Sequence, residues 1–277
     1  MNKVWLVTGA SSGFGRAITE AAVAAGDIVV AAARRTAPLD DLVAAHPDQV
    51  EALPLDVTDI AGAQAAVDGV AARHGRIDVL VNNAGRGMVG AVEDTTDADL
   101  RDLMDLHFFG PAALTRAALP HMRRRGSGAV VQLTSMGGRL AFAGVGAYCA
   151  TKFALEGLSE ALAAEVAPHG IRVLIVEPGA FRTGFAGAAA LRPSAAPDAY
   201  QDTVGPVLSG LPGGSGQEPG DPAKAAAAVL TALDADEPPL RLPLGNDAAD
   251  AITDHLDTAR AELRTWEKLI RSTDFDD

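Results

Sequence analysis

The chain has 277 residues, of which 48% are hydrophobic and 21% are charged, so it can form a large core and disorder is excluded as its main state. Acidic residues outnumber basic ones by 36 to 23, and the net charge of −13 argues against nucleic acid and anionic membranes as partners. No run of 18 apolar residues and no signal-peptide layout occur, which predicts a cytoplasmic protein. The single cysteine, Cys149, excludes an internal disulfide, and the histidine spacing predicts no metal site.

Short β-branched or apolar segments alternate with longer alanine-rich segments along the chain. This alternation is typical of a parallel sheet covered by helices on both faces. Seven strands joined by helical crossovers predict an α/β fold with one doubly wound, Rossmann-type catalytic domain over residues 1–277. In chain order the expected strands are Val4–Thr8, Ile28–Ala33, Val50–Asp56, Ile77–Val81, Ala129–Thr134, Val173–Glu177 and Leu240–Leu244.

Two segments depart from the alternation. Residues 186–222 are rich in Gly, Pro, Ala and Ser, which predicts a long substrate loop whose most flexible part is 211–216. Residues 247–271 predict an amphipathic helix that packs on the domain or, as the less favoured alternative, on a neighbouring subunit. Its apolar stripe has alternating spacings of four and three residues and consists of Ile252, Leu256, Ala259, Leu263, Trp266 and Ile270.

A glycine-rich segment directly follows the first strand and begins a helix. Glycines there allow backbone N–H groups to approach a pyrophosphate, which then lies at the positive end of the helix. A hydrolase nucleophile elbow, G-x-S-x-G, is the alternative, but only eight residues precede the first glycine, too few for the required oxyanion loop. The residues predicted to bind a dinucleotide are Gly9, Ser11, Ser12, Gly13, Phe14 and Gly15.

The second strand ends in Arg34 and Arg35. In NAD-binding proteins a carboxylate about 20 residues beyond the glycine turn accepts the ribose 2′-hydroxyl. A carboxylate would repel the 2′-phosphate of NADP, whereas an arginine can bind it with two parallel N–H donors. The pair therefore predicts NADP(H) in preference to NAD(H), and the alternative is that both arginines are solvated loop charges.

Three polar residues in the middle of the chain predict proton-transfer chemistry. Tyr148 and Lys152 are four residues apart on one face of a predicted helix, and Ser135 closes the fifth strand. An ammonium about 4 Å from a phenolate favours its ionisation by roughly 4 kcal/mol, or about three pKa units. We therefore expect Lys152 to lower the pKa of Tyr148 so that it acts as acid and base, while Ser135 holds a carbonyl oxygen.

Together with Asn82-Asn83-Ala84-Gly85 and residues 178–183, these ordered motifs make residues 3–244 resemble the short-chain dehydrogenase/reductase family. The resemblance is to its main NADP(H)-preferring branch, with hydroxysteroid- and retinol-dehydrogenase-like scaffold segments. It implies an NADP(H)-dependent carbonyl reductase or alcohol dehydrogenase in which Tyr148 and Lys152 also contact the cofactor. The further cofactor-binding residues that it implies are Asp56 and Val57 at the adenine, Asn82, Ala84 and Gly85 along the cofactor, and Pro178, Gly179, Phe181 and Thr183 at the carboxamide.

One position departs from the family pattern. His107 stands where the family usually has an asparagine that helps to hold a proton-relaying water. Histidine also donates and accepts hydrogen bonds, and it titrates near pH 6.5. We expect His107 to act as a catalytic residue that keeps the relay and makes it pH-sensitive, and the alternative is that it fills the helix or bonds a backbone group.

The substrate is expected between residues 86–90, residues 136–145 and the segment after Thr183. The apolar character of this region predicts a medium-sized ketone or secondary alcohol, with Arg86 and Arg139 as anchors for a polar end. The alternatives are a cofactor-binding protein without redox turnover and a non-redox enzyme such as an epimerase or dehydratase. The resemblance implies a homodimer or homotetramer. The apolar residues expected in the pocket are Met88, Leu140, Phe142, Val145 and Phe185.

Overall fold

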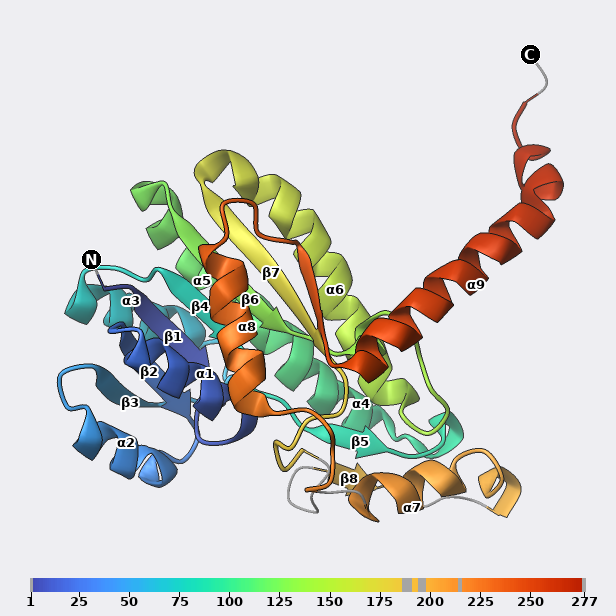
Figure 1. Cartoon of the computed structure of the whole chain (residues 1–277), viewed down its shortest axis with the longest axis horizontal. Coiled ribbons are helices and arrows are strands. Elements are labelled where there is room, and N and C mark those ends of the chain that lie inside the picture. Colours follow the sequence, from blue (N-terminus) through green and yellow to red (C-terminus); the bar gives the residue numbers. More distant parts are fainter. Residues whose placement is uncertain (1, 186–190, 194–197, 214–215, 276–277) are drawn as a thin grey trace.

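The computed structural model describes residues 2–185, 191–193, 198–213 and 216–275. Its centre is a parallel sheet with the strand order β3-β2-β1-β4-β6-β7-β9 (Figure 1). All seven predicted strands are present, and their ends differ from the predicted ones by two residues at most. The strands are β1 (Val4–Thr8), β2 (Ile28–Ala33), β3 (Val50–Pro54), β4 (Val79–Asn82), β6 (Gly128–Leu133), β7 (Ile171–Pro178) and β9 (Arg241–Leu244).

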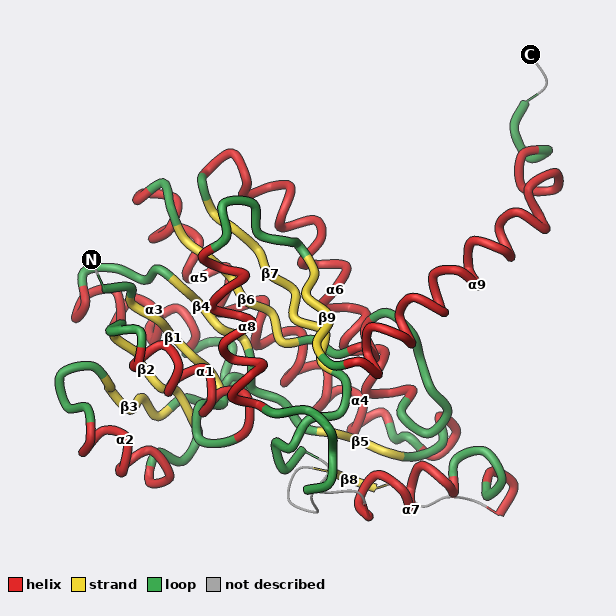
Figure 2. The backbone as a smooth tube through the Cα atoms, in the orientation of Figure 1, coloured by secondary structure: helices red, strands yellow, loops and turns green. Residues whose placement is uncertain are grey.

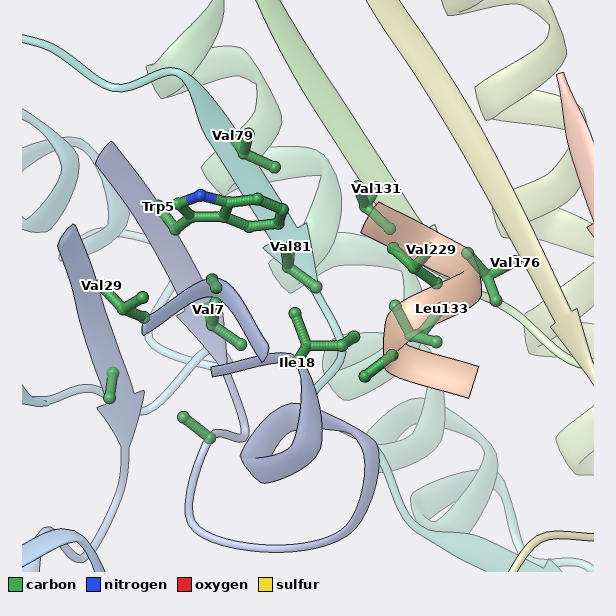
Figure 3. Packing of buried hydrophobic residues seen from close by; sticks show 14 of the residues in the cluster. Trp5, Val7, Ile18, Val29, Val79, Val81, Val131, Leu133, Val176 and Val229 are labelled. Atoms are coloured by element: carbon green, nitrogen blue, oxygen red, sulfur yellow. The ribbon is translucent and has the colours of Figure 1, made fainter. Parts of the chain in front are cut away.

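Both faces of the sheet are covered because side chains alternate along each buried strand. Trp5 and Val7 of β1 join the core on one face, and Val4 and Leu6 join the core on the other (Figure 3 shows the first). The predicted α/β fold is therefore confirmed. The first face is covered by α1 (Gly13–Ala24), α2 (Asp40–Ala45) and α8 (Pro222–Asp234), and the second by α3 (Ala63–His74), α5 (Gly110–Arg125) and α6 (Gly146–Val166).

The strand order reverses beside β1, which pairs with β2 on one side and with β4 on the other. Connections that leave in opposite directions open a crevice at the carboxyl ends of the strands, where ligands bind in doubly wound folds. The glycine turn after β1, residues 82–85 after β4, Ser135 after β6 and residues 178–183 at the end of β7 all lie along this edge. The fold therefore brings four of the predicted site segments together.

The segment 186–222 contains regular structure, so the prediction of one long loop is wrong for its described part. The short strand β8 (Leu191–Pro193) pairs with β5 (Gly87–Val89) as a separate two-stranded sheet, and α7 (Gly205–Gly213) follows. Of the segment 211–216 that was predicted to be most flexible, 214–215 lie outside the described residues. Earlier in the chain, α4 (Asp97–Met104) continues into α5 through a π-helical turn at Asp105–Phe109.

The predicted C-terminal helix is α9 (Asn246–Arg271), and it leaves the body of the molecule (Figures 1 and 2). Only Ala248 and Ile252 are buried, whereas Leu256 and every later residue of the stripe except Ala259 expose 47% or more of their surface. The favoured prediction that the stripe packs on the domain is therefore wrong beyond the first two turns. Among the helices in the described ranges, α9 included, none is long and apolar enough to cross a membrane.

Candidate active site

The glycine turn between β1 and α1 is in close contact with the backbone of the segment that follows β4. A Cβ atom at Gly9 would lie 2.8 Å from Ala84 Cα, and one at Gly15 would lie 2.4 Å from Gly9 O. Gly9 and Gly13 have φ angles of 64° and 54°, a region that other residues rarely adopt. Glycine is therefore required for the shape of this turn, which leaves room for a ligand to approach the backbone.

The N-terminus of α1 has the properties of an anion site. Ser12 provides no side-chain cap, and the first turn has no acidic residue. The first N–H groups of a helix have no partner within it, and they lie at the positive end of its dipole. Arg34 and Arg35 follow β2 and are both exposed. These features fit a dinucleotide, because they offer uncompensated N–H donors and positive charge where its phosphates would bind.

Thr8 and Asn83 hold the turn against the end of β4. Thr8 Oγ1 accepts hydrogen bonds from the backbone N–H of Asn83 at 2.9 Å and of Ala84 at 3.1 Å, and Asn83 Nδ2 donates to Thr8 O at 2.9 Å. The side chain of Asn82 is instead buried and donates to Gln132 Oε1 at 3.0 Å, so it is directed into the protein and away from the crevice. Thr8 was not among the predicted site residues, although a threonine immediately before the glycine turn was a visible signal.

Residues 178–183 are packed against the glycine turn. The rings of Phe14 and Phe181 are 5.0 Å apart, and a Cβ atom at Gly13 would lie 3.0 Å from Thr183 Cβ. Asp247, from the first turn of α9, accepts a hydrogen bond from Ala180 N at 2.7 Å and so fixes this segment. The structure thus joins the predicted phosphate-binding and carboxamide-binding segments in one site.

The two residues predicted at the adenine differ in their surroundings. Asp56 is exposed, and hydrogen bonds from Thr58 lower the pKa of its carboxyl group, with a smaller contribution from the charge of Arg34. Val57 is 7% exposed and its side chain belongs to the core. The arginine that follows β2 and the carboxylate that follows β3 therefore lie near each other, whereas the side chain of Val57 is directed into the protein.

Ser135, Tyr148 and Lys152 converge although they come from different elements. Gly137 lies close to both Ser135 and Tyr148, since a Cβ atom there would be 3.4 Å from Ser135 Oγ and 3.6 Å from Tyr148 Cε1. A hydrogen bond joins the side chains of Ser135 and Tyr148. Lys152 Nζ lies 5.6 Å from the centroid of the Tyr148 ring and donates to Leu133 O at 2.9 Å.

The expected lowering of the Tyr148 pKa is not found in the protein alone. Burial raises the pKa of Tyr148 above its usual value, and the hydrogen bond with Ser135 only partly opposes this effect. Burial also lowers the pKa of Lys152 to about 8, against the opposing charge of Glu156. The expectation was wrong because it placed a fully charged ammonium about 4 Å from the phenol oxygen, whereas desolvation dominates at both groups.

His107 lies in the π-helical turn, and both of its ring nitrogens have partners within the protein. Nε2 accepts from Arg86 N at 3.1 Å, and Nδ1 donates to Thr151 Oγ1 at 2.8 Å, because the Thr151 hydroxyl itself donates to Tyr148 O at 2.7 Å. Burial, with the charges of Lys152 and Arg86, holds the pKa of His107 well below 6.5. This geometry does not support a titrating relay and agrees with the alternative that His107 bonds a backbone group.

A buried cluster of charges under the site was missed by the sequence analysis. Arg241 donates to Glu156 Oε2 at 3.0 Å and is 3.1 Å from Glu177 Oε1, and Arg139 donates to Glu177 at 3.2 Å. Glu177 is completely buried, and burial raises the pKa of Glu156 to about 7. Arg139, predicted to be a substrate anchor, is therefore engaged inside the protein. The four-residue spacing of Lys152 and Glu156 was the available signal.

The region predicted to bind the substrate lies next to Tyr148. The ring of Phe185 is 5.6 Å from the ring of Tyr148 and is 37% exposed. Met88 is buried in β5, and a Cβ atom at Gly144 would lie 3.2 Å from Val207 of α7. The structure therefore places α7 against the segment 136–145. Of the remaining apolar residues predicted there, Leu140 and Val145 are partly buried and Phe142 is 38% exposed.

Fold and site together define a doubly wound enzyme with a dinucleotide crevice beside a Ser-Tyr-Lys constellation. Residues 3–192 match the family model for short chain dehydrogenases. The oxidoreductase BOA17 of Botryotinia fuckeliana is 39% identical over 270 residues, which cover 97% of this chain and 98% of that protein. The chain therefore belongs to the short-chain dehydrogenase family and is an oxidoreductase that acts on CH–OH and C=O groups.

Solved structures of this family have the same fold. A short-chain dehydrogenase from Streptomyces avermitilis is 63% identical to this chain. The two structures match with a TM-score of 0.94, and the match covers 99% of this chain and 100% of that chain. A short chain dehydrogenase from Burkholderia cenocepacia in complex with NADP is 26% identical. Its structure matches with a TM-score of 0.73, and the match covers 95% of this chain and 96% of that chain.

Proposed function

We propose that this chain is an NADP(H)-dependent reductase or dehydrogenase that transfers hydride between the nicotinamide and a ketone or secondary alcohol. The observation that carries the proposal is the convergence of Ser135 and Tyr148 at the carboxyl edge of the sheet, with Lys152 buried next to Tyr148. The bound cofactor would supply or take the hydride, and the protein would bind, orient and protonate the substrate.

The cofactor would be held by backbone groups at one end and by arginine at the other. The N–H groups of the glycine turn and of the first turn of α1 would bind the pyrophosphate. Arg34 and Arg35 would bind the 2′-phosphate that distinguishes NADP from NAD. Support for this preference comes from the exposure of both arginines after β2, where NAD-binding proteins have a carboxylate instead.

Tyr148 would act as the acid in reduction and as the base in oxidation. Its phenol is protonated at neutral pH, since a tyrosine pKa is ordinarily near 10 and burial raises it further. It therefore has a proton to donate when the carbonyl carbon gains hydride and the C=O π electrons move to oxygen. Ser135 would donate a second hydrogen bond to that oxygen and hold it in place. The ammonium of Lys152 would stabilise the tyrosinate formed after proton transfer.

His107 would be a positioning residue in this scheme. It connects the backbone of Arg86, beyond β4, to Thr151, which in turn bonds the backbone of Tyr148. The ring of His107 also meets the ring of Tyr148 edge-on, at 5.6 Å between centroids. This chain of contacts would fix the distance between the cofactor crevice and the acid group without a change in protonation.

The two tyrosines of the chain provide a test with its own control. Tyr148→Phe should lower kcat for NADPH-dependent ketone reduction by about 10²- to 10⁴-fold and leave the Kd for NADPH unchanged. Tyr200→Phe removes a hydroxyl that bonds Glu93 and should change kcat little. Unchanged turnover in Tyr148→Phe would contradict the assignment.

The unchanged protein also tests the two alternative functions. Binding of NADPH without its oxidation across a broad ketone panel would favour a cofactor-binding protein. Product formation without net NADPH consumption would favour a non-redox enzyme.

Cofactor preference is tested separately with Arg34→Ala. The variant should lose affinity for NADPH by about tenfold or more and bind NADH as the unchanged protein does, because only NADPH has the 2′-phosphate. Equal affinity of the unchanged protein for NADH and NADPH would overturn the preference.

A further inference from the structure

The outer part of α9 presents an apolar stripe that nothing in the described chain covers. Leu256, Leu263 and Trp266 are 48%, 63% and 58% exposed, and the helix points away from the sheet (Figures 1 and 2). Helices in proteins gain most of their stability from packing of an apolar face, and a continuous exposed apolar stripe usually marks an interaction site. We therefore expect a binding partner to cover this stripe.

The spacing of the stripe identifies the partner as another helix. Steps of four and three residues average 3.5, the repeat of a coiled-coil seam, whereas a helix that covers a sheet has a wider apolar face. In this repeat Leu256, Leu263 and Ile270 occupy one core position, and Ile252, Ala259 and Trp266 occupy the other. A second copy of this chain supplies a helix with the same seam.

The flanking charges distinguish the two possible directions. In a parallel pair Glu262 would face Glu267 of the partner subunit, and two such repulsive contacts would form. In an antiparallel pair with Leu263 opposite Trp266 of the partner subunit, Arg260 would face the partner's Glu267. Twofold symmetry repeats this attractive contact, so the charges favour the antiparallel arrangement.

We propose that α9 is an antiparallel two-helix interface between two copies of this chain. The midpoint of the overlap lies between residues 264 and 265, about 19 Å along the helix from Ile252 at about 1.5 Å per residue. The two bodies would then lie at opposite ends of the pair. In the single chain Glu267 accepts a hydrogen bond from Arg271 at 2.8 Å, and both side chains are more than half exposed, so the carboxylate can also receive the partner's Arg260.

The first experiment measures the mass of the full chain in solution by sedimentation. Leu263→Asp should remove one twofold association, converting a dimer to a monomer or a tetramer to a dimer, because it buries a charge in the seam. Ala261→Asp adds the same charge outside the seam and should leave the mass unchanged. Equal Kd values for NADPH in all forms verify folding independently of turnover. An unchanged mass for Leu263→Asp overturns the proposal.

The second experiment tests the direction by exchanging charges. Arg260→Glu and Glu267→Arg should each weaken the association about tenfold at low ionic strength, since each turns two attractive contacts into repulsive ones. The double variant should restore the affinity to within about twofold. Tighter association of Glu267→Arg alone would show parallel pairing and overturn the arrangement. Failure of the double variant to restore affinity would indicate docking elsewhere, for instance in the hollow at Leu100, Met104 and Phe109, and would also overturn it.

Discussion

The carboxyl edge of the sheet and the outer part of α9 are built in opposite ways. At the edge, polar side chains are buried and bonded, as with His107, Lys152 and Glu177, which are 1%, 5% and 0% exposed. On α9 apolar side chains face water, as with Leu263 and Trp266. Buried charges reduce stability unless they are compensated, and exposed apolar stripes reduce solubility. Neither region follows the usual pattern of apolar side chains inside and polar side chains outside. Catalytic chemistry accounts for the buried polar groups at the edge, and association with a second copy accounts for the exposed apolar groups on α9.

The glycine turn should be the part of the edge that tolerates change least. Gly15→Ala places a Cβ atom 2.4 Å from Gly9 O and from Asn83 Nδ2, so the turn must move and the Kd for NADPH should rise about 100-fold. Gly157→Ala is the control, because Gly157 lies on the exposed side of α6 with no atom near its added Cβ. It should be neutral or stabilising by up to about 1 kcal/mol. Equal NADPH binding by the two variants would contradict this difference.

Loss of a carboxylate should be costly at the edge and harmless on α9. Glu177→Gln leaves the partly buried guanidinium groups of Arg139 and Arg241 undercompensated and should lower the free energy of unfolding by about 3 kcal/mol in urea titrations. Glu267→Gln breaks an exposed ion pair with Arg271 and should change it by less than about 0.5 kcal/mol. The measurements are made at protein concentrations below those at which the chains associate. Similar losses in the two variants would remove the distinction between the two regions.

The pH dependence of the edge follows from Lys152. Because burial lowers its pKa to about 8, the ammonium is lost as pH rises through that value, and activity should fall there. Glu156→Gln removes a charge that raises the Lys152 pKa, so the alkaline limb of kcat should move to lower pH by up to about one unit. Glu160→Gln, an exposed neighbour that also bonds Arg241, should leave the limb in place. An unmoved limb in Glu156→Gln would exclude this coupling.

The free energy of unfolding should depend on the titration of Lys152 in the direction opposite to activity, and should rise with pH. The unfolded chain holds this proton up to a pKa of about 10.5, whereas the folded chain releases it near 8. Between these values the unfolded state binds more protons, so the contribution of Lys152 to the free energy of unfolding should rise with pH. Comparison of urea titrations of the unchanged protein and Lys152→Met across this window measures that contribution. A contribution that falls with pH would contradict the assigned shift.

Substitution of His107 should have a smaller effect than the changes at Gly15, Glu177 and Lys152. His107→Asn should lower kcat by less than about tenfold while the rate profile between pH 6 and 7 keeps its shape, because the ring is neutral and bonded internally. A new or lost inflection in that range would restore the titrating relay. The control is His255→Asn on the exposed surface of α9, which should change neither rate nor profile.

The sequence was informative where structure depends on local pattern. Alternating apolar strands and helical segments identified all seven strands of the main sheet, and the glycine turn was recognisable because its conformation needs glycine at Gly9 and Gly13. Long-range partners were not predictable. The partners of His107 are 21 and 44 residues away, and Arg139 pairs with Glu177 38 residues away. For α9 the spacing identified the residues that share a face, but spacing alone cannot say what covers that face.

Hydride transfer with Tyr148 as the proton donor can be measured with NADPH that carries deuterium at the transferable position of the nicotinamide. The unchanged protein should give an alcohol with deuterium on the carbinol carbon. Tyr148→Phe should bind the labelled NADPH with the same Kd and form almost no labelled alcohol. An unlabelled product from the unchanged protein, or full transfer by Tyr148→Phe, would contradict the mechanism.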